Sequence, residues 1–282
     1  MSICNALTID VEDYFHVSAF AHNIKRDDWD RYPSRVGYNT CRLLDLLDEF
    51  KVKATFFVLG WVAEKNPALI KEIDFRGHEV ACHGYSHQLV YNQTRDSFRY
   101  ETIHAKTIIQ EIIQKPVLGY RAASYSITDA SKWALDILVE AGFLYDSSIF
   151  PIRHDRYGIP NAVDVPHKYN TEYGNTIVEF PLSTAKLFGV KLPIAGGGYF
   201  RLYPYKVTKA GLMQLNKNNK TFIFYIHPWE IDPNQPKIRS NILSKFRHYN
   251  NLDKCEGRMR KLIAEFRFST AFDVLKQHDL FG

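Results

Sequence analysis

Cysteine is scarce in this sequence, and its placement excludes a fold built on disulfides. The 282-residue chain has four cysteines, which lie far apart and form no C-x-x-C pair: Cys4, Cys41, Cys82 and Cys255. Disulfide-rich domains need more cysteines per residue, at closer spacing. The pattern therefore indicates reduced thiols in a cytosolic protein.

Long hydrophobic runs are also missing. The longest apolar stretch, around "ATFFVLGWVA", has about half the length of a membrane span. The opening residues, "MSICNALTIDVEDYF", show no basic segment followed by an apolar one, so we expect no signal peptide and a cytoplasmic location. Solenoid-type repeats and low-complexity segments are absent as well. We therefore expect neither a membrane span nor a repeat architecture.

Charge of one sign does not dominate. The formal net charge is +5, and the basic residues near the end of the chain alternate with acidic ones. This arrangement is typical of a solvated helix face rather than of a nucleic-acid-binding patch. With 45% hydrophobic residues, the chain has enough apolar side chains for one large α/β domain or two small ones.

Short apolar runs alternate with helical patterns along the chain. Strands are predicted at 5–10, 53–60, 78–83, 117–123, 143–148, 176–182 and 221–230, and helices at 40–50, 66–77, 94–114, 128–142, 207–216 and 256–266. Such alternation predicts a parallel sheet or barrel. Polar residues follow the predicted strand ends, where a βα barrel carries its chemistry: Asp10, His83, Arg121, Asp146 and His227.

Two histidines lie four residues apart in "RGHEVACHGYSH" (76–87). In a helical turn, His83 and His87 would present both rings to one metal ion, whereas in a surface turn they would only bond to backbone. The stretch "TIDVEDYFH" adds Asp10, Glu12 and Asp13, a cluster of like charges that favours a bound cation. Two imidazoles and one carboxylate leave open positions on the ion, which is typical of a catalytic site.

Five motifs in order, "TIDVED", "HGYSH", "YRAASYS", "YDSS" and "FYIHPWE", resemble those of the NodB-homology polysaccharide deacetylases, carbohydrate esterase family 4. The segment "GGGYFRLYP" and the C-terminal tail are similar to a subgroup associated with exopolysaccharide biosynthesis. The resemblance implies an α/β fold, a distorted (β/α)-barrel over 1–235 with a helical extension over 236–282 packed on the same domain. It also implies hydrolysis of N-acetyl groups on amino sugars.

The resemblance implies a role for individual residues. Asp10 matches the catalytic base and His227 the general acid, while Arg121 would orient Asp10 and Asp146 would tune His227. Tyr125 lies where the family supplies a backbone donor to the oxyanion.

The metal ligands implied by the resemblance are two histidines and one carboxylate around one divalent ion. His83 and His87 match the histidines. Because the family's adjacent aspartates are replaced here, either Glu12 or Asp13 could be the carboxylate, and strand alternation favours Glu12. Zinc is the expected metal, with cobalt, nickel and manganese as alternatives.

Three further residues are candidates for substrate contact. Tyr199 could stack on a sugar ring, and Arg201 could hold an anionic group. Trp229 could form an apolar wall beside the acetyl methyl group or belong to the core.

The expected function is release of acetate from an N-acetylated saccharide, either a polymer or its biosynthetic precursor, with no nucleic-acid partner. Three alternatives remain: an amidase or cyclic-imide hydrolase of the same fold, an inactive carbohydrate-binding protein, and a phosphate-ester hydrolase. The last would usually need a two-metal site. A binding protein would need neither the base Asp10 nor the acid His227.

Overall fold

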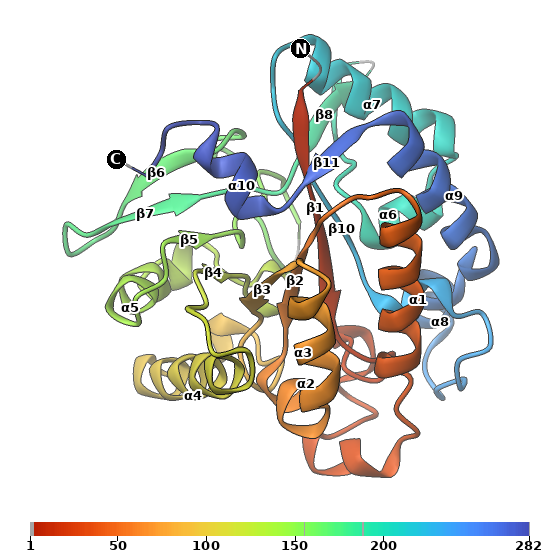
Figure 1. Cartoon of the computed structure of the whole chain (residues 1–282), viewed down its shortest axis with the longest axis horizontal. Coiled ribbons are helices and arrows are strands. Elements are labelled where there is room, and N and C mark those ends of the chain that lie inside the picture. Colours follow the sequence, from red (N-terminus) through yellow and green to blue (C-terminus); the bar gives the residue numbers. More distant parts are fainter. Residues whose placement is uncertain (1–2, 155, 188, 282) are drawn as a thin grey trace.

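The computed structural model describes residues 3–154, 156–187 and 189–281. A nine-stranded sheet forms its centre, in the order β10-β1-β2-β3-β4-β5-β7-β6, with β11 also paired to β1 (Figure 1). The strands of this sheet are β1 (Cys4–Val11), β2 (Thr55–Val58), β3 (Glu79–Cys82), β4 (Gly119–Tyr120), β5 (Tyr145–Asp146), β6 (His167–Asn170), β7 (Thr176–Glu179), β10 (Ile223–Ile226) and β11 (Arg267–Ser269). A separate hairpin joins β8 (Thr184–Leu187) and β9 (Val190–Pro193).

Helices surround the strands (Figure 1). Their bounds are α1 (Val36–Glu49), α2 (Gly60–Lys65), α3 (Pro67–Phe75), α4 (Arg95–Ile113), α5 (Ala134–Glu140), α6 (Gly197–Leu202), α7 (Tyr205–Lys217), α8 (Ile242–Tyr249), α9 (Leu252–Glu265) and α10 (Ala271–Lys276). Neighbouring helices pack in chain order, α3 on α4 and α4 on α5. Together with the mostly parallel sheet, this arrangement confirms the predicted distorted (β/α)-barrel.

The parallel register brings the predicted site residues to one edge. β1 is buried along its whole length and pairs with β2 and β10 on its two sides. Ile9 is opposite Ile226, Val58 is opposite Cys82, and Cys82 is opposite Tyr120. These pairs lie at or near the carboxyl ends of the strands, so the residues that follow them emerge at the same edge of the sheet.

The sequence missed the short or polar elements. In β6, exposed and half-buried side chains alternate, and β8, β9 and β11 have three or four residues each, too few for a periodic pattern. The start of α1 at Val36 precedes the prediction by four residues, and α5 begins at Ala134 after a 3₁₀ turn capped by Thr128.

The C-terminal segment is built into the barrel. β11 pairs in parallel with the first half of β1, and α9 packs against the 3₁₀ helix η6 (Pro228–Ile231). The segment predicted as an extension thus supplies a strand to the central sheet. Within the described ranges, no helix has the length and apolar character required to cross a bilayer.

Gly196 is a position where the fold requires glycine. Its φ of 131° is open to glycine but strained for other residues, and a Cβ would lie 1.9 Å from the carbonyl oxygen of Tyr225. We therefore expect Gly196→Ala to lower the free energy of unfolding by several kcal/mol, more than the roughly 1–3 kcal/mol of backbone strain alone. Denaturant titration would measure the loss.

Gly257 provides the matched control, because it lies exposed inside α9 with nothing near its Cβ position. Gly257→Ala should raise stability by about 0.5–1 kcal/mol through helix propensity. Equal effects of the two substitutions would contradict the close approach of Gly196 to β10.

Candidate active site

Glu12, His83 and His87 form a cluster at the carboxyl edge of the sheet. One ligand atom from each lies within 4.8 Å of the others. His83 follows β3, and its Nδ1 lies 2.7 Å from the carbonyl oxygen of Arg121. Because a carbonyl oxygen only accepts hydrogen bonds, Nδ1 carries the proton, and Nε2 keeps its lone pair for another partner. The first-motif carboxylate and both second-motif histidines therefore converge.

The Glu12 carboxylate supports a metal in this cluster. Its Oε1 accepts a hydrogen bond from Trp229 Nε1 at 3.3 Å. Its Oε2 is buried without a hydrogen-bond partner, although His87 Nε2 lies 2.9 Å away. Burial would raise the pKa of Glu12, but His87 and His227 lower it below its ordinary value. An ionised, unsatisfied carboxylate oxygen between two imidazoles fits a divalent cation.

One interpretation of the i, i+4 spacing placed the two histidines in a helical turn, but they do not lie on a helix. His83 and His87 lie in the loop after β3, and His87 adopts a left-handed backbone conformation with φ of 51°. This conformation turns the His87 ring back toward Glu12. The loop, and not helical periodicity, brings the imidazoles together.

The sequence left Asp13 open as an alternative metal ligand, but its contacts give it a structural role. Its Oδ2 accepts hydrogen bonds from the backbone N–H groups of Arg35 and Val36, at 2.7 and 3.0 Å, and from the Ser34 hydroxyl. Its Oδ1 accepts from the N–H of Tyr14. Oδ2 is thus used at the N-terminus of α1, where N–H groups lack helical partners, and Oδ1 is used in the loop after β1. These contacts leave Glu12 as the candidate carboxylate ligand.

Asp10 lies beside the cluster and is held by Arg121. Arg121 Nη1 donates to Asp10 Oδ1 at 2.7 Å and to the Thr8 hydroxyl at 2.8 Å. Arg121 is fully buried, and its remaining nitrogens donate to the carbonyl and hydroxyl oxygens of Ser147. Burial opposes its charge, but Asp10 raises the pKa of Arg121. Asp10 Oδ2 is left facing His227 Nε2 at 3.8 Å.

His227 follows β10 and is oriented by Glu230. The backbone N–H of His227 donates to Glu230 Oε2, and the ring Nδ1 lies 3.3 Å from the same oxygen. Burial opposes protonation, but Glu12 and Glu230 raise the pKa of His227 to about 9. The sequence missed Glu230, although "HPWE" places it three residues after His227.

Arg201, predicted to contact substrate, is instead buried beneath this pair. Its Nε donates to Glu230 Oε1 at 2.8 Å, and its Nη1 and Nη2 donate to backbone carbonyl oxygens of α8 and the residue after it. A side chain that is 2% exposed and bonded on all its nitrogens cannot hold a ligand. Arg201 fixes Glu230, which in turn fixes His227.

The resemblance implied that Asp146 would tune His227, but in the structure the partners of Asp146 lie elsewhere. Its carboxylate accepts from the N–H and hydroxyl groups of Ser148 and lies against Glu179. Burial raises the pKa of Asp146 to about 6, and burial together with Asp146 raises that of Glu179 well above its ordinary value. Two buried carboxyl groups in contact share a proton. The pair supports the Ser147–Ser148 segment that holds Arg121.

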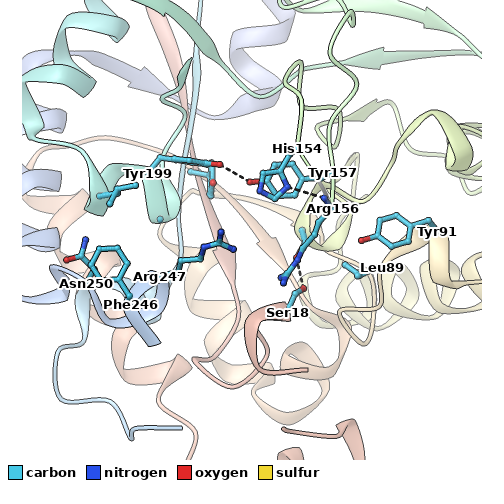
Figure 2. A pocket seen from close by; sticks show the side chains of 14 residues that line it. Ser18, Leu89, Tyr91, His154, Arg156, Tyr157, Tyr199, Phe246, Arg247 and Asn250 are labelled. Atoms are coloured by element: carbon cyan, nitrogen blue, oxygen red, sulfur yellow. Dashed lines mark hydrogen bonds between the residues drawn. The ribbon is translucent and has the colours of Figure 1, made fainter. Parts of the chain in front are cut away.

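Tyr125 is placed differently from the prediction, and for Trp229 the structure favours the core alternative. The backbone N–H of Tyr125 donates to the carbonyl oxygen of Ala122 at 3.0 Å, so it is not available to an oxyanion in this conformation. Trp229 is 4% exposed and stacks between His227 and His248. Its indole therefore packs against the His227 ring and donates a hydrogen bond to Glu12. Tyr199 does line an open pocket beside the site (Figure 2).

Two family models match the chain. The polysaccharide deacetylase model matches residues 28–143, and a domain of unknown function (DUF3473) matches residues 147–276. Residues 28–143 therefore match the polysaccharide deacetylase family, which confirms the resemblance seen in the motifs. Membership of the exopolysaccharide subgroup stays a prediction.

Curated relatives and solved structures agree with this family. A peptidoglycan-N-acetylglucosamine deacetylase of Bacillus cereus is 31% identical over 32% of this chain and 42% of its own length. A chitooligosaccharide deacetylase of Sinorhizobium fredii is 32% identical over 44% of this chain and 58% of its own length. The chain thus spans about half the length of these relatives.

A crystal structure from Mycobacterium smegmatis, assigned to the polysaccharide deacetylases, superimposes with a TM-score of 0.69 at 20% identity. The superposition covers 98% of this chain and 90% of that one, so the likeness of fold extends through both matched regions.

The contacts of Glu12 and Asp13 predict opposite effects of two similar substitutions. Glu12→Gln removes the charge from the metal cluster and should weaken metal affinity at least about tenfold. Asp13→Asn removes acceptors from the α1 terminus and should lower stability by about 1–2 kcal/mol with metal retained. Metal content after dialysis, together with thermal unfolding, would check both. The reverse ranking of metal loss would make Asp13 the ligand.

The Asp146–Glu179 pair predicts a pH dependence of stability. Since its folded-state pKa values are raised, the folded state binds more protons than the unfolded state above pH about 4. The pair's contribution to stability is therefore full at low pH and is lost as pH rises through about 6 and beyond. Glu179→Gln keeps the hydrogen bonding and removes the shared proton.

The Glu179→Gln variant should gain stability relative to the parent between pH 4 and 8. Denaturant titrations of both proteins at several pH values would measure this difference. A constant difference across the range would contradict a shared proton.

Proposed function

We propose that this protein is a metal-dependent hydrolase that removes N-acetyl groups from amino sugars of a saccharide and releases acetate. The observation that carries the proposal is the pair Asp10 and His227, 3.8 Å apart, beside the Glu12–His83–His87 cluster. A carboxylate base and an imidazole acid next to a metal cluster form the set that amide hydrolysis requires. The deacetylase relatives support this reaction class.

Glu12, His83 and His87 would hold one divalent ion, with zinc as our first expectation and cobalt, nickel or manganese as alternatives. When bound, the ion supplies a Lewis acid that polarises the acetamide carbonyl group. The protein fixes the ligands beforehand: Trp229 orients Glu12, and the Arg121 carbonyl oxygen sets the His83 tautomer.

Asp10 acts as the base. Because Arg121 occupies Oδ1, only Oδ2 is directed toward the space shared with His227. A water molecule in that space transfers a proton to Asp10 Oδ2 while its oxygen forms a bond to the acetamide carbon. Arg121 holds the carboxylate in one orientation, as a base needs before attack.

His227 acts as the acid. Nδ1 is directed to Glu230, so Nε2 faces the reacting atoms. When the bond between the acetamide carbon and the nitrogen breaks, His227 Nε2 transfers its proton to the departing nitrogen. The products are acetate and a free amino sugar. Glu230 keeps the imidazole in the orientation that this transfer requires.

Acetate release would test the proposal. Purified protein should be freed of metal, reloaded with zinc, cobalt, nickel or manganese, and assayed on N-acetylated oligosaccharides and nucleotide sugars. We expect acetate in a metal-dependent manner from at least one saccharide. Turnover of small cyclic imides, with none of the saccharides cleaved, would favour the amidase alternative instead.

The division of roles predicts different substrate dependence for two variants. Asp10→Asn should retain metal and lose roughly 10²–10⁴-fold in turnover on any substrate, because attack by water still needs a base. His227→Ala should lose a similar factor on amides but recover on an activated acetyl ester, whose leaving group departs without protonation. Steady-state rates on matched amide and ester substrates would measure this.

Metal content serves as the control in both variants, since neither residue belongs to the ligand set. Equal losses on ester and amide in both proteins would count against the assignment of base and acid.

A further inference from the structure

A pocket of about 340 Å³ lies beside the proposed catalytic residues (Figure 2). Tyr225 forms part of its lining, and the centroid of the Tyr225 ring is 5.7 Å from that of His227. On another side, the hydroxyls of Ser18 and Ser124 are hydrogen bonded at 2.7 Å. The pocket therefore begins one aromatic ring away from the proposed acid.

The region of unknown function builds most of this pocket. All of its lining residues except Ser18, Leu89, Tyr91 and Ser124 come from residues 147–276. The metal ligands and Asp10, by contrast, precede that region. The part of the chain that the deacetylase model does not cover therefore contributes a wall where a substrate would extend from the site.

Two arginines give the pocket a positive charge. Arg156, between β5 and β6, and Arg247, on α8, reach into it from opposite sides (Figure 2). Neither guanidinium forms an ion pair within the described ranges, and none of the pocket's described lining residues is an aspartate or glutamate. Many arginines elsewhere in the fold are paired, as Arg99 is with Glu140 and Arg260 with Glu49. Two cations that face one cavity and have no ion pair in the described part of the chain favour an anionic ligand.

The aromatic walls fit a sugar ring. Tyr157 stacks on His154 at 3.8 Å and on Phe150 at 5.7 Å, and its hydroxyl lies 3.3 Å from that of Tyr199. Figure 2 shows this hydroxyl pair at one end of the pocket, with the arginines below it. Tyrosine combines a flat apolar face for the C–H groups of a sugar with a hydroxyl for its polar edge. Because the rings support one another, the wall is formed before a ligand binds.

We infer that this pocket binds a negatively charged substituent of the saccharide, through Arg156 and Arg247, while the tyrosines hold the adjoining sugar. The inference rests on the proposed function for the position of the reacting acetamide, and it specifies the substrate class as an anionic N-acetylated saccharide. The shared chemistry is a carboxylate or phosphate group. Its two sources would be an acidic sugar within the chain or a glycosyl phosphate at its end.

Paired substrates would test the inference on the metal-loaded protein. One pair is an N-acetylated disaccharide with either a hexuronate or a neutral hexose neighbour, and the other is N-acetylglucosamine 1-phosphate against its methyl glycoside. We expect the charged member of at least one pair to have a kcat/KM and an affinity about tenfold higher, an advantage that shrinks in high salt. The pair that shows the preference identifies the source of the charge.

Arg156→Gln and Arg247→Gln should each reduce this ratio of charged to neutral substrate, and the double variant should abolish it. Arg153→Gln is the matched control, because Arg153 is exposed in the same segment but does not line the pocket. It should keep the ratio. Equal affinity for charged and neutral members of both pairs, or a preference that survives the double variant, would overturn the inference.

Calorimetric binding separates this inference from the proposed function. A charge preference in binding that is lost in the double arginine variant would support the pocket assignment, even if no saccharide released acetate. The lack of acetate release would count only against the deacetylase proposal. Acetate release without charge preference would support the deacetylase proposal and count against the pocket assignment.

Discussion

The buried guanidinium of Arg121 is the group on which the rest of the site depends. It pairs with Asp10, while the carbonyl oxygen of the same residue receives the Nδ1 proton of His83. One residue thus orients the proposed base and sets the tautomer of a proposed metal ligand. A fully buried cation is tolerated only when its donors are satisfied, and Asp10, Thr8 and Ser147 satisfy them. Any movement of Arg121 would therefore disturb both functions.

A second buried ion pair organises the opposite side. Arg201 bonds to Glu230, and Glu230 bonds to His227. Both systems use an arginine out of contact with solvent to fix a carboxylate near the reacting atoms. The first joins β1 to β4 and its loop, whereas the second joins α6, η6 and α8. The region of unknown function is therefore not an appendage, since it supplies the acid side of the proposed catalytic pair.

The same region extends the site outward. α6 carries Arg201 on its buried side and contributes Tyr199 to the pocket. α8 accepts hydrogen bonds from Arg201 through its backbone and offers Arg247 to the same pocket. The elements that fix the proposed acid thus also shape the surface where a saccharide would lie. A charge preference in that pocket would be coupled to the catalytic geometry through shared helices.

The sequence by itself determined the order of strands and helices and the five motifs that converge at one sheet edge. Alternating apolar periods are local properties, and a parallel sheet necessarily gathers its carboxyl ends. The sequence could not choose between Glu12 and Asp13, because the answer lies in the N–H groups of α1 that Asp13 accepts. It also could not place short polar strands such as β6, whose pairing depends on β7.

The tertiary structure decided which charged residues face the site and which support it. Arg201 and Asp146 are charged residues of the kind expected in a functional site, yet the hydrogen bonds of both lie within the protein interior. Glu230 is held by Arg201, and Arg156 and Arg247 meet at one pocket, through packing between segments distant in sequence. A side chain's partner depends on contacts that local sequence does not encode. For this reason the motifs identified the edge of the sheet that carries the proposed site, and only the fold showed what surrounds it.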